Sequence, residues 1–181
     1  MARVEAPVPD EQLAAVLAPY RLPDGRPMEL FGLLAHAPAA LTDLRRATTA
    51  CLRDLDLPVR AREVVVLRTL ARAGADAEWA LHVHLFAADA GLDATDLAAL
   101  AGDPAGLPGP ERRLTALADA CHAAAGRLPD PLWGELSADG WSTGQLVGFL
   151  VVAGQYRKVA VLVNALQVEV PAGLAGIPRT G

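Results

Sequence analysis

The sequence is poor in residues that carry thiol chemistry, since only two of its 181 residues are cysteines. Cys51 and Cys121 lie far apart and form neither a CxxC pair nor a metal-ligand spacing, so we expect two buried, reduced thiols. The sequence also lacks a GxSxG nucleophile elbow and a glycine-rich phosphate loop. These absences argue against the common serine-hydrolase and phosphate-binding mechanisms.

Basic clusters and aromatic side chains are scarce as well. The net charge is −5, the sixteen basic residues are scattered, and aromatic residues make up only 4% of the chain. Without a basic patch interleaved with aromatic residues, we expect no nucleic-acid partner. The first nine residues mix charge with proline and contain no apolar run, so we expect no signal peptide and a cytoplasmic location.

Apolar residues are abundant, at 52% of the chain, and are mostly alanine, leucine and valine. This length and composition predict one all-α domain in which closely packed helices share a single core. Proline, glycine and capping residues divide the chain into an N-terminal arm with a short helix at 1–27, a helical domain at 28–170 and a C-terminal tail at 171–181.

The segment 142–166 is apolar almost all round. A polar cluster at its middle argues against a membrane span, and a helix that is apolar on every side in so short a chain favours a contact between subunits. We therefore expect a homo-oligomer, either a trimer, a hexamer or a dimer, that is not embedded in a membrane.

The run Val64-Val65-Val66-Leu67 has the composition of a strand. We predict a helix there, because helix-forming residues flank the run and no second strand is present to pair with it. Gly74 predicts the end of that helix and Asp76 a cap for the next one. Helices are predicted at about 10–17, 28–35, 38–55, 58–73, 76–89, 93–101, 110–125, from 131 onward and at 142–166.

The most chemically suggestive stretch runs from Arg60 to Asp89 and contains three titratable residues at informative positions. Glu63 is in register with the apolar residues that follow it, so it is predicted to point inward. Glu78 and His82 are four residues apart and therefore share one face of the second helix. A glycine break between the two helices lets these faces meet.

Metal binding is disfavoured in this stretch. His82 and His84 lie roughly 200° apart around a helix, so they cannot easily bind one ion, and no further ligand is suitably spaced. General acid/base chemistry is the remaining option, because a nearby carboxylate can tune a histidine. Burial is expected to raise the pKa of Glu63, making it an acid or the partner that orients His82. From spacing alone, an ion pair or packing pair is the simpler interpretation.

The stretch REVVVLRTLARAGADAEWALHVHLFAADAGL resembles the central motif of the carboxymuconolactone decarboxylase family, which includes the AhpD-like alkylhydroperoxidases. In the peroxidase branch, a glutamate is followed twelve and fifteen residues later by the cysteines of a CxxC, and then by a histidine four residues on. Counting from Glu63 reaches Ala75, Glu78 and His82. The glutamate and histidine are present and both cysteines are absent, so the chain is more similar to the thiol-free branch.

The resemblance extends from about Leu30 to the GQYRKVAVLVNAL segment before Pro171. It implies an AhpD-like helical bundle, an oligomer, and a pocket lined by Glu63, Glu78 and His82. Three further residues are predicted to help bind the substrate: Trp79 as a wall, and Arg68 or Arg157 as a positive charge. A structural role is an equally good interpretation for Trp79. Arg157 is the better candidate of the two arginines, although a salt bridge at a subunit contact is the simpler explanation for it.

From the resemblance and the acid/base residues we expect a cofactor-free lyase or isomerase. Its substrate would be a small carbonyl-activated organic acid, lactone or similar metabolite, with His82 moving the proton. One alternative is an AhpD-like thiol peroxidase that uses Cys51 or Cys121. The other is a helical oligomer that binds a small ligand without turning it over.

Overall fold

A computed structural model of the protein describes residues 2–22, 25, 27–123 and 125–179. Its regular elements are helices, which confirms the all-α prediction, and within those residues the only β-type pairing is an isolated bridge between Arg21 and Pro27. The helices are α1 (Glu11–Leu17), α2 (Glu29–Leu33), η1 (Leu34–His36), α3 (Pro38–Thr49), η2 (Ala50–Asp54), α4 (Val59–Ala73), α5 (Asp76–Phe86), α6 (Ala94–Ala101), η3 (Pro104–Gly106), α7 (Gly109–His122), α8 (Asp130–Ala138) and α9 (Thr143–Leu166).

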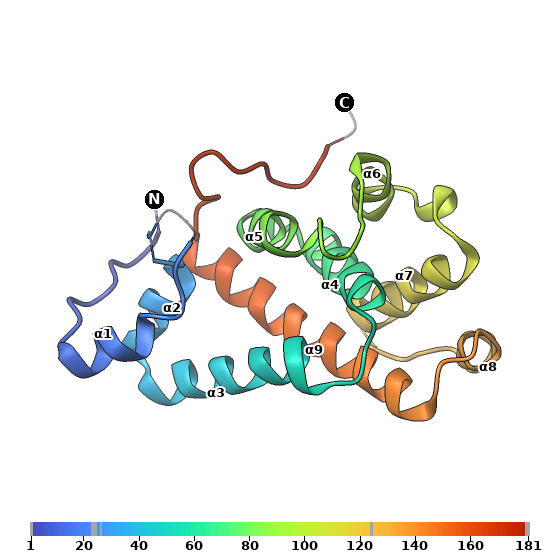
Figure 1. The fold of residues 1–181 in the computed structure, drawn as a ribbon, viewed down its shortest axis with the longest axis horizontal. Coiled ribbons are helices and arrows are strands. Elements are labelled where there is room, and N and C mark those ends of the chain that lie inside the picture. The colour runs from blue at the N-terminus through green and yellow to red at the C-terminus, as the bar shows by residue number, and fades with distance from the viewer. Residues whose placement is uncertain (1, 23–24, 26, 124, 180–181) are drawn as a thin grey trace.

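Helix α4 lies at the centre of the bundle, between α7 and α9, and α5 folds back beside it (Figure 1). The valine run in α4 is helical and completely buried, because neighbours cover it on every side. The helix ends at Gly74, which adopts the left-handed conformation with φ 62°. A residue with a side chain adopts that conformation only at a cost, so glycine favours the reversal that brings α5 against α4.

Helix α9 crosses the whole bundle and has the predicted capping box, in which Ser142 accepts from the backbone of Gln145 and the Gln145 side chain accepts in return. Among the described residues, α9 is the one helix long and apolar enough to span a membrane, and 56% of its most apolar window is buried inside the fold. That burial is typical of a core helix.

Two local features differ from the sequence-based expectation. The helix predicted at 38–55 changes at Ala50 into the single π-helical turn η2. Asp76 does not cap α5, because its carboxylate instead accepts from the Ile177 backbone and from Arg179 in the C-terminal tail. The tail is thereby held across the start of α5, the helix that contains Glu78 and His82 (Figure 1).

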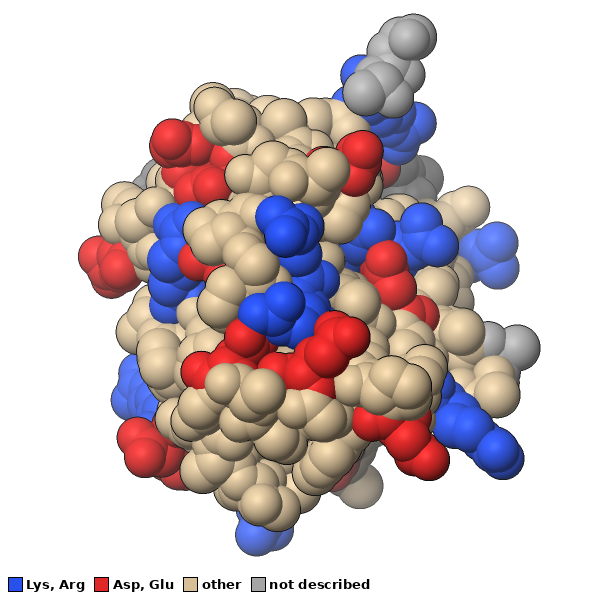
Figure 2. Space-filling view, turned by 90° about the vertical axis from the view of Figure 1, so that its right-hand side faces the viewer, with Lys and Arg blue, Asp and Glu red and all other residues tan. Residues whose placement is uncertain are grey.

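The surface turned to the viewer in Figure 2 mixes positive and negative side chains without a continuous basic area. The apolar side chains most exposed along α9 are Val147, Val151 and Val161, which share one face of that helix. Exposed valines in such a row are typical of a surface that another subunit covers.

We therefore expect the protein to form a homo-oligomer through this face of α9. Light scattering should give a mass of several chains for the wild type, and Val151→Glu should shift it towards the single chain because a charge is costly in an apolar contact. Val8→Glu, at a position that is 94% exposed in the N-terminal arm, is the matched control. A stable folded monomer of the wild type at micromolar concentration would contradict the prediction.

Candidate active site

The centre of the candidate site is a buried pair formed by Glu63 of α4 and His82 of α5. The Glu63 side chain has no exposed area, the His82 side chain is 4% exposed, and Glu63 Oε2 lies 2.8 Å from His82 Nδ1. The reversal at Gly74 brings the two residues together although they are nineteen positions apart. The inward orientation of Glu63 follows from its register with the apolar side of α4.

Arg62 is a third member that sequence reasoning missed. Its Nε atom donates to Glu63 Oε1 over 2.8 Å, and its Nη1 atom donates to the Leu52 carbonyl in the π-helical turn η2. The guanidinium also lies over the ring of Phe86, 5.6 Å from its centre. Adjacent residues on a helix normally point in different directions, so residue spacing offers little signal for this contact.

The ionisation state of Glu63 corrects the sequence-based prediction. Burial by itself would raise the pKa of this carboxyl, but the neighbouring His82 and the Arg62 guanidinium outweigh burial and hold the pKa below its usual value. Glu63 is therefore a carboxylate at neutral pH and not a proton donor. Its two oxygens accept one hydrogen bond each, from Arg62 and from His82.

This pairing fixes how His82 presents its ring. An ionised carboxylate can only accept hydrogen bonds, so Nδ1 carries the hydrogen and Nε2 is turned towards Glu78, whose Oε1 is 3.8 Å away. The rings of Tyr156 and Phe86 pack against the imidazole, with centres 4.7 Å and 5.1 Å away. Orientation by a carboxylate on one nitrogen leaves the other nitrogen available for proton transfer.

Glu78 differs from Glu63 in its environment. Its side chain is 16% exposed, and its Oε1 atom lies 3.8 Å from His82 Nε2. Burial raises the pKa of the Glu78 carboxyl, and His82 offsets that increase only in part. The pKa values of the two carboxyls close to His82 are therefore shifted in opposite directions: that of Glu63 is lowered and that of Glu78 is raised.

Glu78 and His82 line a cavity of about 210 Å³, here called the inner pocket. Its walls are formed mainly by apolar side chains from several elements, among them Leu30 of α2, Leu44 of α3, Leu85 of α5 and Val159 of α9. The wall also includes these polar or charged residues: Tyr20, Thr48, Arg53, Glu78, His82 and Tyr156. A small apolar space with a few convergent polar groups is the usual form of a ligand site.

A second cavity of about 290 Å³, here called the outer cavity, adjoins the inner pocket. The two have Met28, Leu30, Glu78 and Leu81 as common wall residues, and the chain at 168–172 also lines the outer cavity. Glu78 therefore lies between the two spaces.

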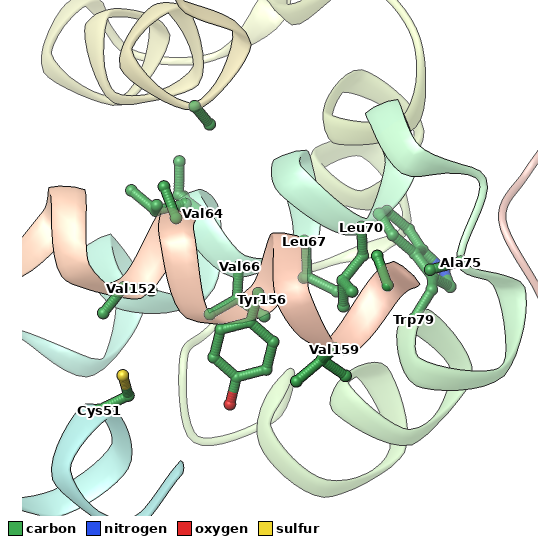
Figure 3. Close-up of a cluster of buried hydrophobic side chains, with 14 of the residues drawn as sticks. Cys51, Val64, Val66, Leu67, Leu70, Ala75, Trp79, Val152, Tyr156 and Val159 are labelled. Carbon is green, nitrogen blue, oxygen red and sulfur yellow. The ribbon is translucent and has the colours of Figure 1, made fainter. Parts of the chain in front are cut away.

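Tyr156 of α9 is another residue that sequence reasoning did not assign to the site. Its ring packs edge-on against His82, and its hydroxyl is buried without a hydrogen-bond partner among the described residues. Figure 3 shows the ring among the buried apolar side chains, with its oxygen turned away from Val66 and Leu67. The available signal was a tyrosine within the polar cluster of an otherwise apolar helix.

Three residues predicted to bind the substrate do not line the inner pocket. The Arg68 guanidinium is paired with Asp119 and with two carbonyls near the end of α6. Arg157 donates to the Cys121 carbonyl of α7. Trp79 is 2% exposed and packs in the core between α4 and α5 (Figure 3). Each points away from the pocket because neighbouring positions on a helix face different directions.

The remaining candidates are placed as follows. His84 is exposed and does not line the inner pocket, in agreement with its register two residues after His82. No group of three metal-ligating side chains lies close together in the described part of the chain. Cys51 is buried and Cys121 half-buried, both are free thiols, and burial raises the pKa of both.

Fold and site together define an all-helical protein with a buried Arg–Glu–His chain at the wall of an apolar pocket. No family model matches the sequence, and no curated protein matches it significantly. The structure is similar to that of an uncharacterised peroxidase-related protein from Silicibacter sp. TM1040, with a TM-score of 0.78, 12% identity, and coverage of 94% of this chain and 92% of that one.

Two other solved structures are similar. The AhpD core of an uncharacterised peroxidase-related protein from Ralstonia eutropha JMP134 has a TM-score of 0.71 and 16% identity, over 94% of this chain and 93% of the other. A protein of unknown function from Agrobacterium tumefaciens has a TM-score of 0.65 and 16% identity, over 77% and 95%. The chain therefore has the AhpD-like helical fold, which confirms the resemblance at the level of the fold.

Proposed function

We propose that the protein is a cofactor-free acid/base enzyme, a lyase or isomerase, that acts on a small carbonyl-activated organic acid, lactone or similar metabolite. The observation that carries the proposal is the 2.8 Å contact between Glu63 and His82, with His82 Nε2 facing Glu78. This arrangement supplies a histidine of fixed orientation together with a carboxyl whose pKa is raised by burial.

In an isomerisation, His82 Nε2 takes a proton from the carbon next to the carbonyl, and the C–H electron pair moves into an enolate. Glu78 then gives its proton to another carbon of the same conjugated system. His82 holds the abstracted proton and returns it to Glu78 across the space between them, so acid and base are restored. In a decarboxylation, the C–C bond to the carboxylate breaks, CO₂ leaves and the electron pair forms the enolate. Glu78 then protonates the carbon and regains its proton from solvent.

The developing enolate needs stabilisation from within the pocket. Arg68 and Arg157 are committed to Asp119 and to the Cys121 carbonyl, so neither supplies it. The Glu78 carboxyl is a donor at the pocket wall whenever it is protonated, and the exposed Arg53 adds a positive charge to the wall of the inner pocket. Arg53 favours a substrate with one acidic group, in keeping with an organic acid.

Proton exchange can be followed on simple model substrates and so tests the function directly. A panel of 3-oxo acids and unsaturated lactones incubated in D₂O should gain deuterium next to the carbonyl, as detected by NMR. The rate should fall as pH rises through the raised pKa of Glu78, because the acid form is lost, and Glu78→Gln should abolish that descending limb. Tight binding of panel members without exchange would instead support the non-catalytic ligand-binding alternative.

The peroxidase-related names of the similar structures favour a second candidate, a thiol peroxidase. Its chemistry needs a thiolate, and burial disfavours the thiolate form of both cysteines by raising their pKa. The positions of the family's redox cysteines are occupied by Ala75 and Glu78. The acid/base proposal therefore accounts better for the groups in the pocket.

The double variant Cys51→Ala/Cys121→Ser is expected to retain the proton-exchange rate of the wild type, since neither thiol lines the inner pocket. The measurement is exchange by NMR, with hydroperoxide consumption followed in parallel. Folding is checked by the midpoint of thermal unfolding, because Cys51 is part of the core. Strong hydroperoxide reduction by the wild type that disappears in the double variant would establish the peroxidase instead.

A further inference from the structure

The inner pocket contains two tyrosines whose hydroxyl groups differ in their partners. Tyr20 accepts a hydrogen bond from Arg45 Nε over 3.1 Å. The hydroxyl of Tyr156 has no partner among the described residues although the residue is only 1% exposed. Buried hydroxyls are nearly always paired, because an unpaired one loses its hydrogen bonds to water and gains nothing in return.

The position of the unpaired hydroxyl relates it to the acid/base groups. Tyr156 lines the same pocket as Glu78 and His82, and its ring centre is 4.7 Å from that of His82. Figure 3 shows the phenol oxygen at the end of the ring that faces away from the apolar contacts with α4. A ligand in the inner pocket would therefore lie among the imidazole of His82, the carboxyl of Glu78 and this hydroxyl.

The hydroxyl acts as a donor at neutral pH. Burial raises the pKa of Tyr156 well above its usual value, and the nearby carboxyls of Glu78 and Glu63 raise it further. A neutral phenol can donate one hydrogen bond and fits an oxygen atom that accepts. The surrounding wall is largely apolar, so a complementary ligand has an apolar body and an accepting oxygen.

We propose that the Tyr156 hydroxyl donates a hydrogen bond to the carbonyl oxygen of the bound substrate and makes the inner pocket selective for small, largely apolar oxo compounds and lactones. This inference deepens the proposed function and rests on it, since the oxygen belongs to the same carbonyl that activates the carbon next to it. The bond strengthens as negative charge develops on that oxygen, so Tyr156 supplies the stabilisation that neither Arg68 nor Arg157 provides.

The test compares two probes of the same shape, cyclohexanone and methylenecyclohexane, in which a CH₂ group replaces the carbonyl oxygen. Dissociation constants are measured by NMR titration for the wild type, Tyr156→Phe and Tyr20→Phe. The ratio of ketone to alkene affinity should fall by about 2- to 10-fold in Tyr156→Phe, the value of one neutral hydrogen bond. It should stay near the wild-type ratio in Tyr20→Phe, because the inference assigns the donated hydrogen bond to Tyr156, whereas the Tyr20 oxygen is held at Arg45 Nε.

Thermal unfolding of the free protein separates a ligand-binding hydroxyl from a structural one. Tyr156→Phe should unfold at or above the wild-type temperature, because the change removes a polar group with no partner among the described residues. An unchanged affinity ratio in Tyr156→Phe, an equal fall in Tyr20→Phe, or no ketone binding by the wild type would overturn the inference. Failure of the deuterium-exchange test would contradict the acid/base function alone, since the affinity ratio requires no turnover.

Discussion

Replacement of His82 by glutamine is expected to lower the rate of substrate proton exchange by roughly 10²–10⁴-fold, the usual contribution of a general acid or base. Glutamine can fill the space between Phe86 and Tyr156 and can still donate to Glu63, but it cannot take up a proton at neutral pH. The loss should appear in kcat more than in KM, because the pocket wall is otherwise unchanged. The measurement is deuterium incorporation into an active member of the oxo-acid and lactone panel.

His84→Gln provides the matched control on the same helix. His84 is exposed and lies outside the inner pocket, so this variant should retain nearly the full rate. A larger loss at His84 than at His82 would mean that the reacting face of α5 had been chosen wrongly. Until that experiment is made, the catalytic roles of Glu63, Glu78 and His82 stay predictions.

Glu63→Gln is expected to destabilise the fold by about 3–5 kcal/mol, the cost of removing one partner from a buried ion pair. Arg62 is 6% exposed and would be left with a buried charge and no carboxylate at its Nε atom. Urea unfolding at pH 7 measures the difference in the free energy of unfolding.

The stabilisation that Glu63 contributes should be lost at low pH. The pKa of Glu63 is lowered in the folded protein from the ordinary value of 4.5, so the stabilisation is complete above that pH and is lost as pH falls towards the folded-state pKa. The gap in stability between wild type and Glu63→Gln should therefore narrow below pH 4.5. Glu78→Gln is the control, and it should cost much less, because Glu63 is bound by the buried Arg62 whereas the contact of Glu78 with His82 is longer, at 3.8 Å. Equal losses at both positions would contradict the buried-pair explanation.

The pattern of the sequence predicted the helices and the core of the site for a simple reason. Helical register depends only on residue spacing, so Glu78 and His82 had to share a face, and Glu63 had to join the apolar side of its helix. Gly74 predicted the reversal because a left-handed residue there ends one helix and redirects the chain. These features are local, and the structure contains them as expected.

Contacts between residues far apart in sequence were not predictable in the same way. The Leu52 carbonyl reaches Arg62 only because α3 ends in a π-helical turn, and Tyr156 reaches His82 only because α9 crosses the bundle beside α5. By residue type, Arg68 and Arg157 could each have supplied a positive charge to the pocket. Their assignment to Asp119 and to the Cys121 carbonyl depends on the direction in which each helix faces its neighbours.

By itself, the sequence determined an all-helical chain, the break at Gly74 and a common inward face for Glu63, Glu78 and His82, because helical periodicity and backbone conformation are local properties. Only the tertiary structure decided the ionisation of the two carboxyls. Burial acts on both, yet His82 and Arg62 lower the pKa of Glu63, while burial outweighs the effect of His82 on Glu78 and raises its pKa. The pKa of a buried group depends on the charges packed against it, and those are set when distant helices come together.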